Sequence, residues 1–341
     1  MIKKYPFVLA TVSALAVTGL NAQTPKNKEG AKPAQPVQPA PPAVVTIDSL
    51  IQEAKAGKMA SQLKLAEAYA KGEGVEKDEV KAAKWYRKAA AQGNVEAMLK
   101  YGDCFAKGAG VGQHFEDAVK WYEAAAEKGN AMGQFKLGIH CANGEGTEDR
   151  GGEAIEWFKK AAAQGLADAQ HRLGNSYAHG EGVGENLEEA VKWYRKAADQ
   201  GHGDAQFRLG DCYAHGEGVA ENREEALKWY LKAADQAHAD AQFTVGNCYA
   251  NGQGTAEDRE KAFGWFKKAA EQGHADAQNS LGDAYAKGLG VAKNPEEAVN
   301  WFRKAAEQGD TGAQHELGNA YRTGEGVCLL YTSDAADDTP C

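Results

Sequence analysis

The chain has 341 residues, of which 43% are hydrophobic and 26% charged, so its composition excludes a polypeptide disordered throughout. Its formal net charge is −9; residues 1–45 carry five lysines against one glutamate, which leaves −13 for the remainder. Affinity for nucleic acid comes from neutralising phosphates, so this acidity argues against nucleic-acid binding and equally against docking on anionic lipid.

The first 22 residues have the layout of a secretory signal peptide. Lys3 and Lys4 precede an apolar stretch from Phe7 to Leu20, and Ala22 offers a small residue for cleavage. The apolar run is about 14 residues, short of the ~20 needed to cross a bilayer as a helix. We expect export to the periplasm or beyond the cell, with no stable membrane insertion after cleavage; an uncleaved anchor is the alternative.

Two short segments separate this signal from the rest of the chain. Residues 23–45 hold six of the nine prolines, which predicts an extended spacer, with a proline-motif ligand as the alternative. Residues 46–57 read TIDSLIQEAKAG. We interpret them as an N-terminal helix that caps the remaining helices of the chain with a more polar outer face.

Tryptophan then recurs with a fixed period of 36 residues. Self-similarity at one period indicates a small unit that is copied and stacked. Stacked arrays mostly present a long surface to a partner and seldom carry out chemistry. The seven positions, which we expect to be structural, are Trp85, Trp121, Trp157, Trp193, Trp229, Trp265 and Trp301.

Each unit predicts a pair of helices. In the copy that starts near Asp204, apolar residues fall on one helical stripe until Gly216-x-Gly218 breaks it. Asn222 then has the character of an N-cap, with Glu225 placed to complete a capping box. The second helix ends at a glycine suited to a left-handed residue, except that Ala237 stands there in this copy and is expected to strain the turn.

A small residue and a large one mark the expected helix contact. Gly210 recurs in the first helix of seven copies and lets helices approach closely, and we expect Trp229 and its equivalents to pack against it. A Trp→Ala change should then cost roughly 3–5 kcal/mol. A row of exposed aromatics for ligand stacking is the alternative.

The combined pattern resembles the Sel-one-like repeat family, a branch of the tetratricopeptide-like solenoids. The resemblance implies an all-α fold, a right-handed α/α superhelical solenoid of 36-residue helix-turn-helix repeats. It covers residues 58–327 with seven full copies and a truncated eighth. Members are typically adaptors, and exported bacterial members bind other proteins at the envelope or in a host. The residues that carry the resemblance are Leu209-Gly210, Tyr213, Gly216-x-Gly218-Val219, Glu225-Ala226, Trp229-Tyr230 and Lys232-Ala233-Ala234.

None of the candidate chemical motifs survives comparison with the repeat. Cys212 and Cys248 are equivalent residues of adjacent repeats, too far apart for a disulfide. Equivalent histidines are likewise too far apart to share one metal ion, so we expect solvated histidines near helix ends and no metal or cofactor. The recurring Gly-x-Gly pairs follow helices rather than strands, which argues against a nucleotide loop.

The exposed side of the first helices is the expected binding surface, since first helices line the concave face in the family. Aromatic residues recur there on an otherwise polar face, although the rings could instead tuck against the adjoining repeat. The candidate partner-binding residues are Phe135, His171, Arg172, Phe207, Arg208, Asp211, Phe243 and Asn247.

The last 14 residues do not follow the 36-residue repeat, and Asp337 stands where the next tryptophan is expected. Residues 328–341 resemble a translated sequencing adapter, and we interpret them as a non-native tail. We therefore expect an exported, non-catalytic and monomeric scaffold that binds a protein or peptide. The alternative is a cell-envelope hydrolase, acting on β-lactams or the cell wall, or a regulator, whose catalytic part is missing from this truncated chain.

Overall fold

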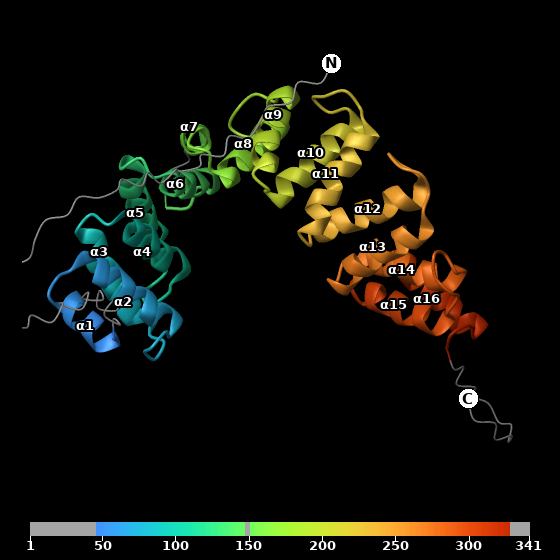
Figure 1. The fold of residues 1–341 in the computed structure, drawn as a ribbon, viewed down its shortest axis with the longest axis horizontal. Helices are drawn as coiled ribbons and strands as arrows, with labels where there is room; N and C mark the ends of the chain where they lie inside the picture. Colours follow the sequence, from blue (N-terminus) through green and yellow to red (C-terminus); the bar gives the residue numbers. More distant parts are fainter. Residues whose placement is uncertain (1–45, 147–150, 328–341) are drawn as a thin grey trace, which may run out of the picture. The chain divides into compact units, whose positions relative to one another are not determined.

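The computed structural model describes residues 46–146 and 151–327, and in these residues it consists of α-helices without strands (Figure 1). The predicted signal peptide, the spacer and the tail at 328–341 lie outside the described residues. The helices are α1 Ile47–Lys55, α2 Met59–Lys71, α3 Glu79–Ala91, α4 Val95–Lys107, α5 Phe115–Glu127, α6 Ala131–Asn143, α7 Gly151–Ala163, α8 Ala167–His179, α9 Leu187–Asp199, α10 Gly203–His215, α11 Arg223–Asp235, α12 Ala239–Asn251, α13 Arg259–Glu271, α14 Ala275–Lys287, α15 Pro295–Glu307 and α16 Thr311–Thr323.

The boundaries of the helices follow their capping residues. In the pair α10 and α11, the first helix ends at Gly216, which is left-handed at φ 72°. The second begins at Asn222, whose side chain accepts a hydrogen bond from the Glu225 backbone N–H at 3.0 Å, as the sequence predicts. The Glu225 carboxylate pairs with Lys228 at 3.0 Å, so the reciprocal half of the expected capping box is replaced by an ion pair.

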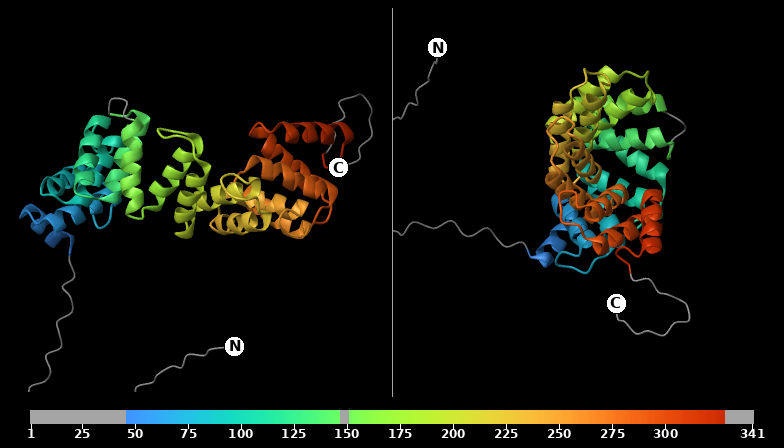
Figure 2. Two further views of the ribbon diagram at one scale, coloured as in Figure 1. Left: turned by 90° about the horizontal axis from the view of Figure 1, so that it is seen from above. Right: turned by 90° about the vertical axis from the view of Figure 1, so that its right-hand side faces the viewer.

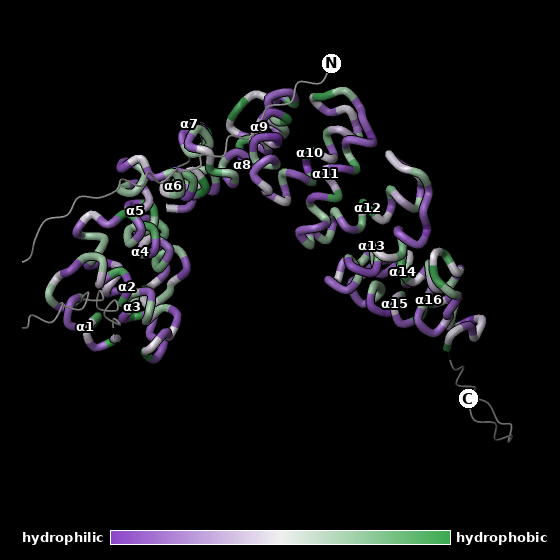
Figure 3. The backbone as a smooth tube through the Cα atoms, in the orientation of Figure 1, coloured by the Kyte–Doolittle hydropathy of each residue, from purple (hydrophilic) through white to green (hydrophobic). Residues whose placement is uncertain are grey.

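Consecutive helices lie side by side along the described chain, each packed on the one before it (Figure 2). Hydrophilic and hydrophobic residues both recur along each helix, and the hydrophobic ones form an apolar side that can be buried (Figure 3). The fold is thus the expected all-α solenoid of 36-residue helix pairs. No helix of the described residues is long and apolar enough to cross a membrane.

The contact at the recurring glycine differs from the prediction. A Cβ on Gly210 would lie 2.5 Å from the ring of Tyr230, which belongs to the second helix of the same repeat. Tyr230 is 3% exposed. The residue that packs against the glycine is therefore the one after the tryptophan, and the expectation that Trp229 does so is wrong. The same pairing joins Gly102 to Tyr122, Gly138 to Phe158, Gly174 to Tyr194, Gly246 to Phe266 and Gly282 to Phe302.

The tryptophans lie at the edge of the core. Only Trp229 is fully buried, and the other six are partly exposed. Six of the seven rings carry a lysine ammonium from the next helical turn, at 3.5 Å from the centroid for Lys232 over Trp229. The exception is Trp121, which meets the Tyr101 ring edge-on at 5.3 Å. The indoles thus pack with one face inward and a cation outside.

Buried amides join one repeat to the next. Gln206 in α10 donates to the carbonyl of Ala198 in the preceding repeat at 3.0 Å. It accepts in turn from the Gln236 amide at the end of α11, at 2.7 Å. These hydrogen bonds satisfy a carbonyl at the C-terminal end of a helix, which would otherwise be buried without a hydrogen-bond donor. Where Met98 replaces the first glutamine, Lys128 replaces the second.

Ala237→Gly is expected to stabilise the chain by about 1 kcal/mol. Ala237 is the one non-glycine residue with positive φ among the described residues, at 63°, where a Cβ is unfavourable. The matched control is Gly201→Ala at the equivalent turn, where φ is 90° and no atom lies within 4 Å of the added Cβ. Urea unfolding should show opposite shifts for the two changes; shifts of the same sign would contradict this reading of the turn.

Candidate partner-binding face

The first helices of the eight repeats share an exposed side, which we call the first-helix face. These first helices are α2, α4, α6, α8, α10, α12, α14 and α16. Phe207 of α10 lies on it, half-buried, with its ring 5.6 Å from Tyr230 and 5.0 Å from His238 of the next repeat. Phe243 is placed the same way, 4.7 Å from His274. Of the two alternatives, the rings therefore adopt the packed one, tucked against the adjoining repeat with part of each ring exposed.

The histidines that these rings contact, and the equivalent His202, are helix caps. His202 precedes α10, and its Nδ1 accepts from the Ala205 backbone N–H at 3.2 Å. Its Nε2 lies 3.3 Å from Asp168 of the preceding repeat, so the ring bridges two repeats. The expectation of solvated histidines is wrong here, because only 16% of the side chain is exposed. His238 and His274 repeat both contacts.

Some acidic and amide side chains of the first-helix face accept hydrogen bonds from tyrosines of the second helices. Asp211 accepts a hydrogen bond from the Tyr230 hydroxyl at 2.8 Å, and burial raises the pKa of its carboxyl. Asn175 accepts likewise from Tyr194. Asn247 holds the same position, but its repeat carries Phe266, which has no hydroxyl to donate. Asp211 therefore has a structural role, and Asn247 lacks the tyrosine hydroxyl that its equivalents Asp211 and Asn175 accept from.

A row of cations runs along the first-helix face at a single position of the repeat. Arg172 and Arg208 keep 37% and 49% of their side chains exposed. The Lys136 ammonium pairs with the Asp103 carboxylate at 2.8 Å, and 29% of the Lys136 side chain is exposed. The position reads Lys64, Lys100, Lys136, Arg172, Arg208, Thr244, Ser280 and Glu316 in chain order, basic in the first five repeats and neutral or acidic afterwards.

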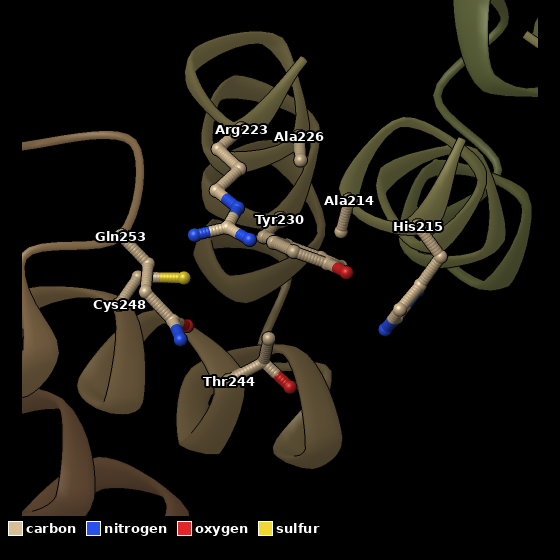
Figure 4. Close-up of a pocket in the computed structure, with 8 residues that line it drawn as sticks. All are labelled: Ala214, His215, Arg223, Ala226, Tyr230, Thr244, Cys248 and Gln253. Atoms are coloured by element: carbon tan, nitrogen blue, oxygen red, sulfur yellow. The ribbon is translucent and has the colours of Figure 1, made fainter. Parts of the chain in front are cut away.

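A small pocket opens between consecutive repeats beside this row. It has a volume of about 220 Å³ and is lined by residues of α10, α11 and α12 together with Gln253 (Figure 4). In Figure 4 the side chains of Arg223, Gln253 and Thr244 surround the Tyr230 ring. Equivalent residues line similar pockets in the next two repeats.

The thiols in this region are held as neutral groups. Burial raises the pKa of Cys248 to about 11 and that of Cys212 to about 12. A protonated thiol is a weak nucleophile and a weak metal ligand. Neither Cys212 nor Cys248 forms a disulfide, in agreement with the distance expected between equivalent residues of adjacent repeats.

His171 stands on the face where most other repeats carry an apolar residue. Its ring lies 4.7 Å from the ring of His202 and 6.0 Å from that of Tyr194. Burial, and next the neighbouring His202, lower the pKa of His171 to about 4, so this imidazole is neutral at physiological pH. The sequence could not reveal this pair, since His171 and His202 occupy different positions of the repeat.

His171→Phe is expected to flatten the acid side of the stability profile. With a folded-state pKa of about 4 against the ordinary 6.5, the folded chain binds fewer protons in this window, so its free energy of unfolding rises with pH there. Acidification from pH 6.5 to 4 should therefore lower the stability by about 1–3 kcal/mol through this group, allowing for its partial exposure. Urea unfolding at several pH values measures the effect; identical pH slopes in both chains would contradict it.

Comparisons with a family model and with solved structures identify the repeat. The Sel1 repeat model matches residues 60–94, 95–130, 131–166, 167–202, 203–238, 239–274, 275–310 and 311–328. The chain belongs to the Sel1 repeat family. No curated protein sequence matches the chain.

Two solved Sel1-type structures are similar over most of the chain. One is a protective antigen of uropathogenic Escherichia coli strains with an SLR fold, at 36% identity and a TM-score of 0.78. That match covers 84% of this chain and 62% of the other, so the chain spans less than two thirds of that protein. The second is a Sel1 repeat protein from Oxalobacter formigenes, at 34% identity and a TM-score of 0.69, covering 80% of this chain and 79% of the other.

Proposed function

We propose that this Sel1 repeat chain is a non-catalytic adaptor that binds a protein or peptide segment along the first-helix face. The observation that carries the proposal is the basic row, whose members Lys64, Lys100 and Arg208 recur at one position and stay exposed, Arg208 with only a long ion pair to Asp211 at 3.7 Å. Partly exposed apolar residues precede them in the sequence and add apolar contact area, namely Leu63, Leu99 and Phe207. Aromatic and arginine side chains together are the usual energetic centres of protein interfaces.

The charges of the first helices indicate the chemistry of the segment. The helices α2, α4, α6 and α8 together carry six basic and four acidic residues, whereas α10, α12, α14 and α16 carry three basic and six acidic ones. A partner segment with acidic residues over the first group of helices would be steered by this field. The pockets between repeats would receive its side chains.

Charge reversal on the face tests the proposal. Selection from a displayed library of random peptides of about 15 residues provides the probe, and fluorescence anisotropy measures the affinity of the selected peptides. The triple change Lys64→Glu, Lys100→Glu and Arg208→Glu should weaken binding by about tenfold or more and leave the helical signal intact.

A matched control uses exposed lysines of the second helices. Lys84→Glu, Lys192→Glu and Lys228→Glu change the net charge by the same amount on the other side of each repeat. The control triple should bind the selected peptides as the unaltered chain does. Equal losses in both triples, or no peptide enriched over scrambled sequences, would remove the assignment of the face.

We also propose that the adaptor acts outside the cytoplasm, in the periplasm or beyond the cell, as a monomer. The support is the basic start and short apolar run within residues 1–22. Expression in a bacterial host followed by N-terminal sequencing should give a mature chain that starts at Gln23. A chain that stays in the cytosol with Met1 attached would exclude export.

A further inference from the structure

One cluster of potential metal ligands breaks the repeat pattern. His171 of α8, His202 before α10 and Asp204 in α10 place their ligand atoms within 4.8 Å of one another. The position of His171 carries phenylalanine in three other repeats, whereas His202 and Asp204 belong to a pair that recurs as His238 with Asp240 and as His274 with Asp276. In the structure Asp204 pairs with His238 at 3.2 Å, so the substitution at one position has brought a second imidazole to His202 and to a carboxylate that already has a partner.

We propose that His171, His202 and Asp204 bind a divalent transition-metal ion such as Zn²⁺. Imidazole and carboxylate together are common ligands of zinc, which takes nitrogen at about 2.0–2.1 Å, and an open fourth position would admit water or a carboxylate of a partner. The two histidines are partly buried and Asp204 is exposed, so the ion can enter from solvent. Asp168 lies beside His202 and adds a second negative charge.

The charged residues around the cluster act on a bound ion in opposite directions. Arg208 lies near His171 and opposes a cation, while Asp168 and Asp204 favour one, so the surrounding formal charge is negative.

Binding has a structural consequence at the start of α10. His202 accepts the Ala205 N–H through Nδ1, which leaves its proton on Nε2, facing Asp168. Either nitrogen can reach the ion only if this cap hydrogen bond is released. We therefore expect moderate affinity, in the micromolar range, rather than that of a structural zinc site.

The repeat supplies both a loss and a gain variant. His171→Phe installs the residue found in three other repeats, so the fold should tolerate it while one ligand disappears. Phe207→His places an imidazole in the equivalent position next to His238 and Asp240. The first change should lower Zn²⁺ affinity at least tenfold, and the second should raise the number of bound ions from one to two.

The full chain without a histidine tag, stripped of metal by a chelator, is titrated with Zn²⁺ by calorimetry and with Co²⁺ by absorption spectroscopy. The expected result is one ion per chain with a nitrogen and oxygen cobalt spectrum. Unchanged affinity in His171→Phe, no binding by the unaltered chain, or intense thiolate charge-transfer bands would each overturn the proposal. Should circular dichroism show that His171→Phe unfolds, Asp204→Asn takes its place, with the same loss expected.

Discussion

Tyr230→Ala should destabilise the chain by about 3–5 kcal/mol, more than the loss of any partly exposed tryptophan. The Tyr230 ring fills the space against Gly210, and its hydroxyl satisfies the carboxylate of Asp211. Removing the ring leaves a cavity and takes the hydroxyl donor from the partly buried Asp211 carboxylate, which keeps only the Arg208 ion pair at 3.7 Å. Urea unfolding followed by circular dichroism measures the loss.

The matched control is Trp265→Ala in the neighbouring second helix. Trp265 is partly exposed, and its ring lies under the ammonium of Lys268 at 3.6 Å. Its removal forfeits one packed face and a cation–π contact, for an expected loss of about 1–3 kcal/mol. A larger loss for Trp265→Ala than for Tyr230→Ala would mean that the indole, not the phenol, organises the helix pair.

Gly218→Ala should destabilise the chain by about 3 kcal/mol or more, through two separate effects. Gly218 has φ 67°, which costs an L-residue about 1–2 kcal/mol. In addition, its Cβ would overlap the carbonyl of Leu187, the first residue of α9 in the preceding repeat. Backbone atoms cannot move aside as the end of a flexible side chain can, so the junction between the repeats must open.

Gly201→Ala separates the two effects, because its φ is 90° and its Cβ would meet nothing within 4 Å. We expect a loss of only about 1–2 kcal/mol there. Equal losses at Gly201 and Gly218 would show that the close approach between repeats is not maintained in solution. The same close approach recurs at Gly110, Gly146, Gly254, Gly290 and Gly326, and it gives the Gly-x-Gly loops a structural reason.

The periodicity of the sequence predicts the helices and their order, since apolar spacing, N-caps and C-terminal glycines act locally. Asn222 and Gly216 lie where these rules place them. These local rules could not predict which residue packs against Gly210. Trp229 and Tyr230 are adjacent and both apolar, and only the crossing of the two helices decides which of them meets the glycine.

The sequence indicates which residues of the first helices could form the candidate face, but not which contacts these residues make within the fold. The pattern identified the aromatic position of Phe207, but the contact with His238 depends on how the next repeat docks. The commitment of Asp211 to Tyr230 is likewise a contact between helices. The basic row is visible in the sequence itself, because the residues after Phe207 and its equivalents, taken in order, are basic in five successive repeats.

The central claim is that the first helices bind a partner while the second helices build the scaffold. A photoreactive amino acid placed in turn at Lys100 and Arg208 on first helices, and at Lys84 and Lys228 on second helices, tests it within cells. We expect both first-helix positions to give a crosslink to the same protein and both second-helix positions to give none. Crosslinks that form only from Lys84 and Lys228 would contradict the claim.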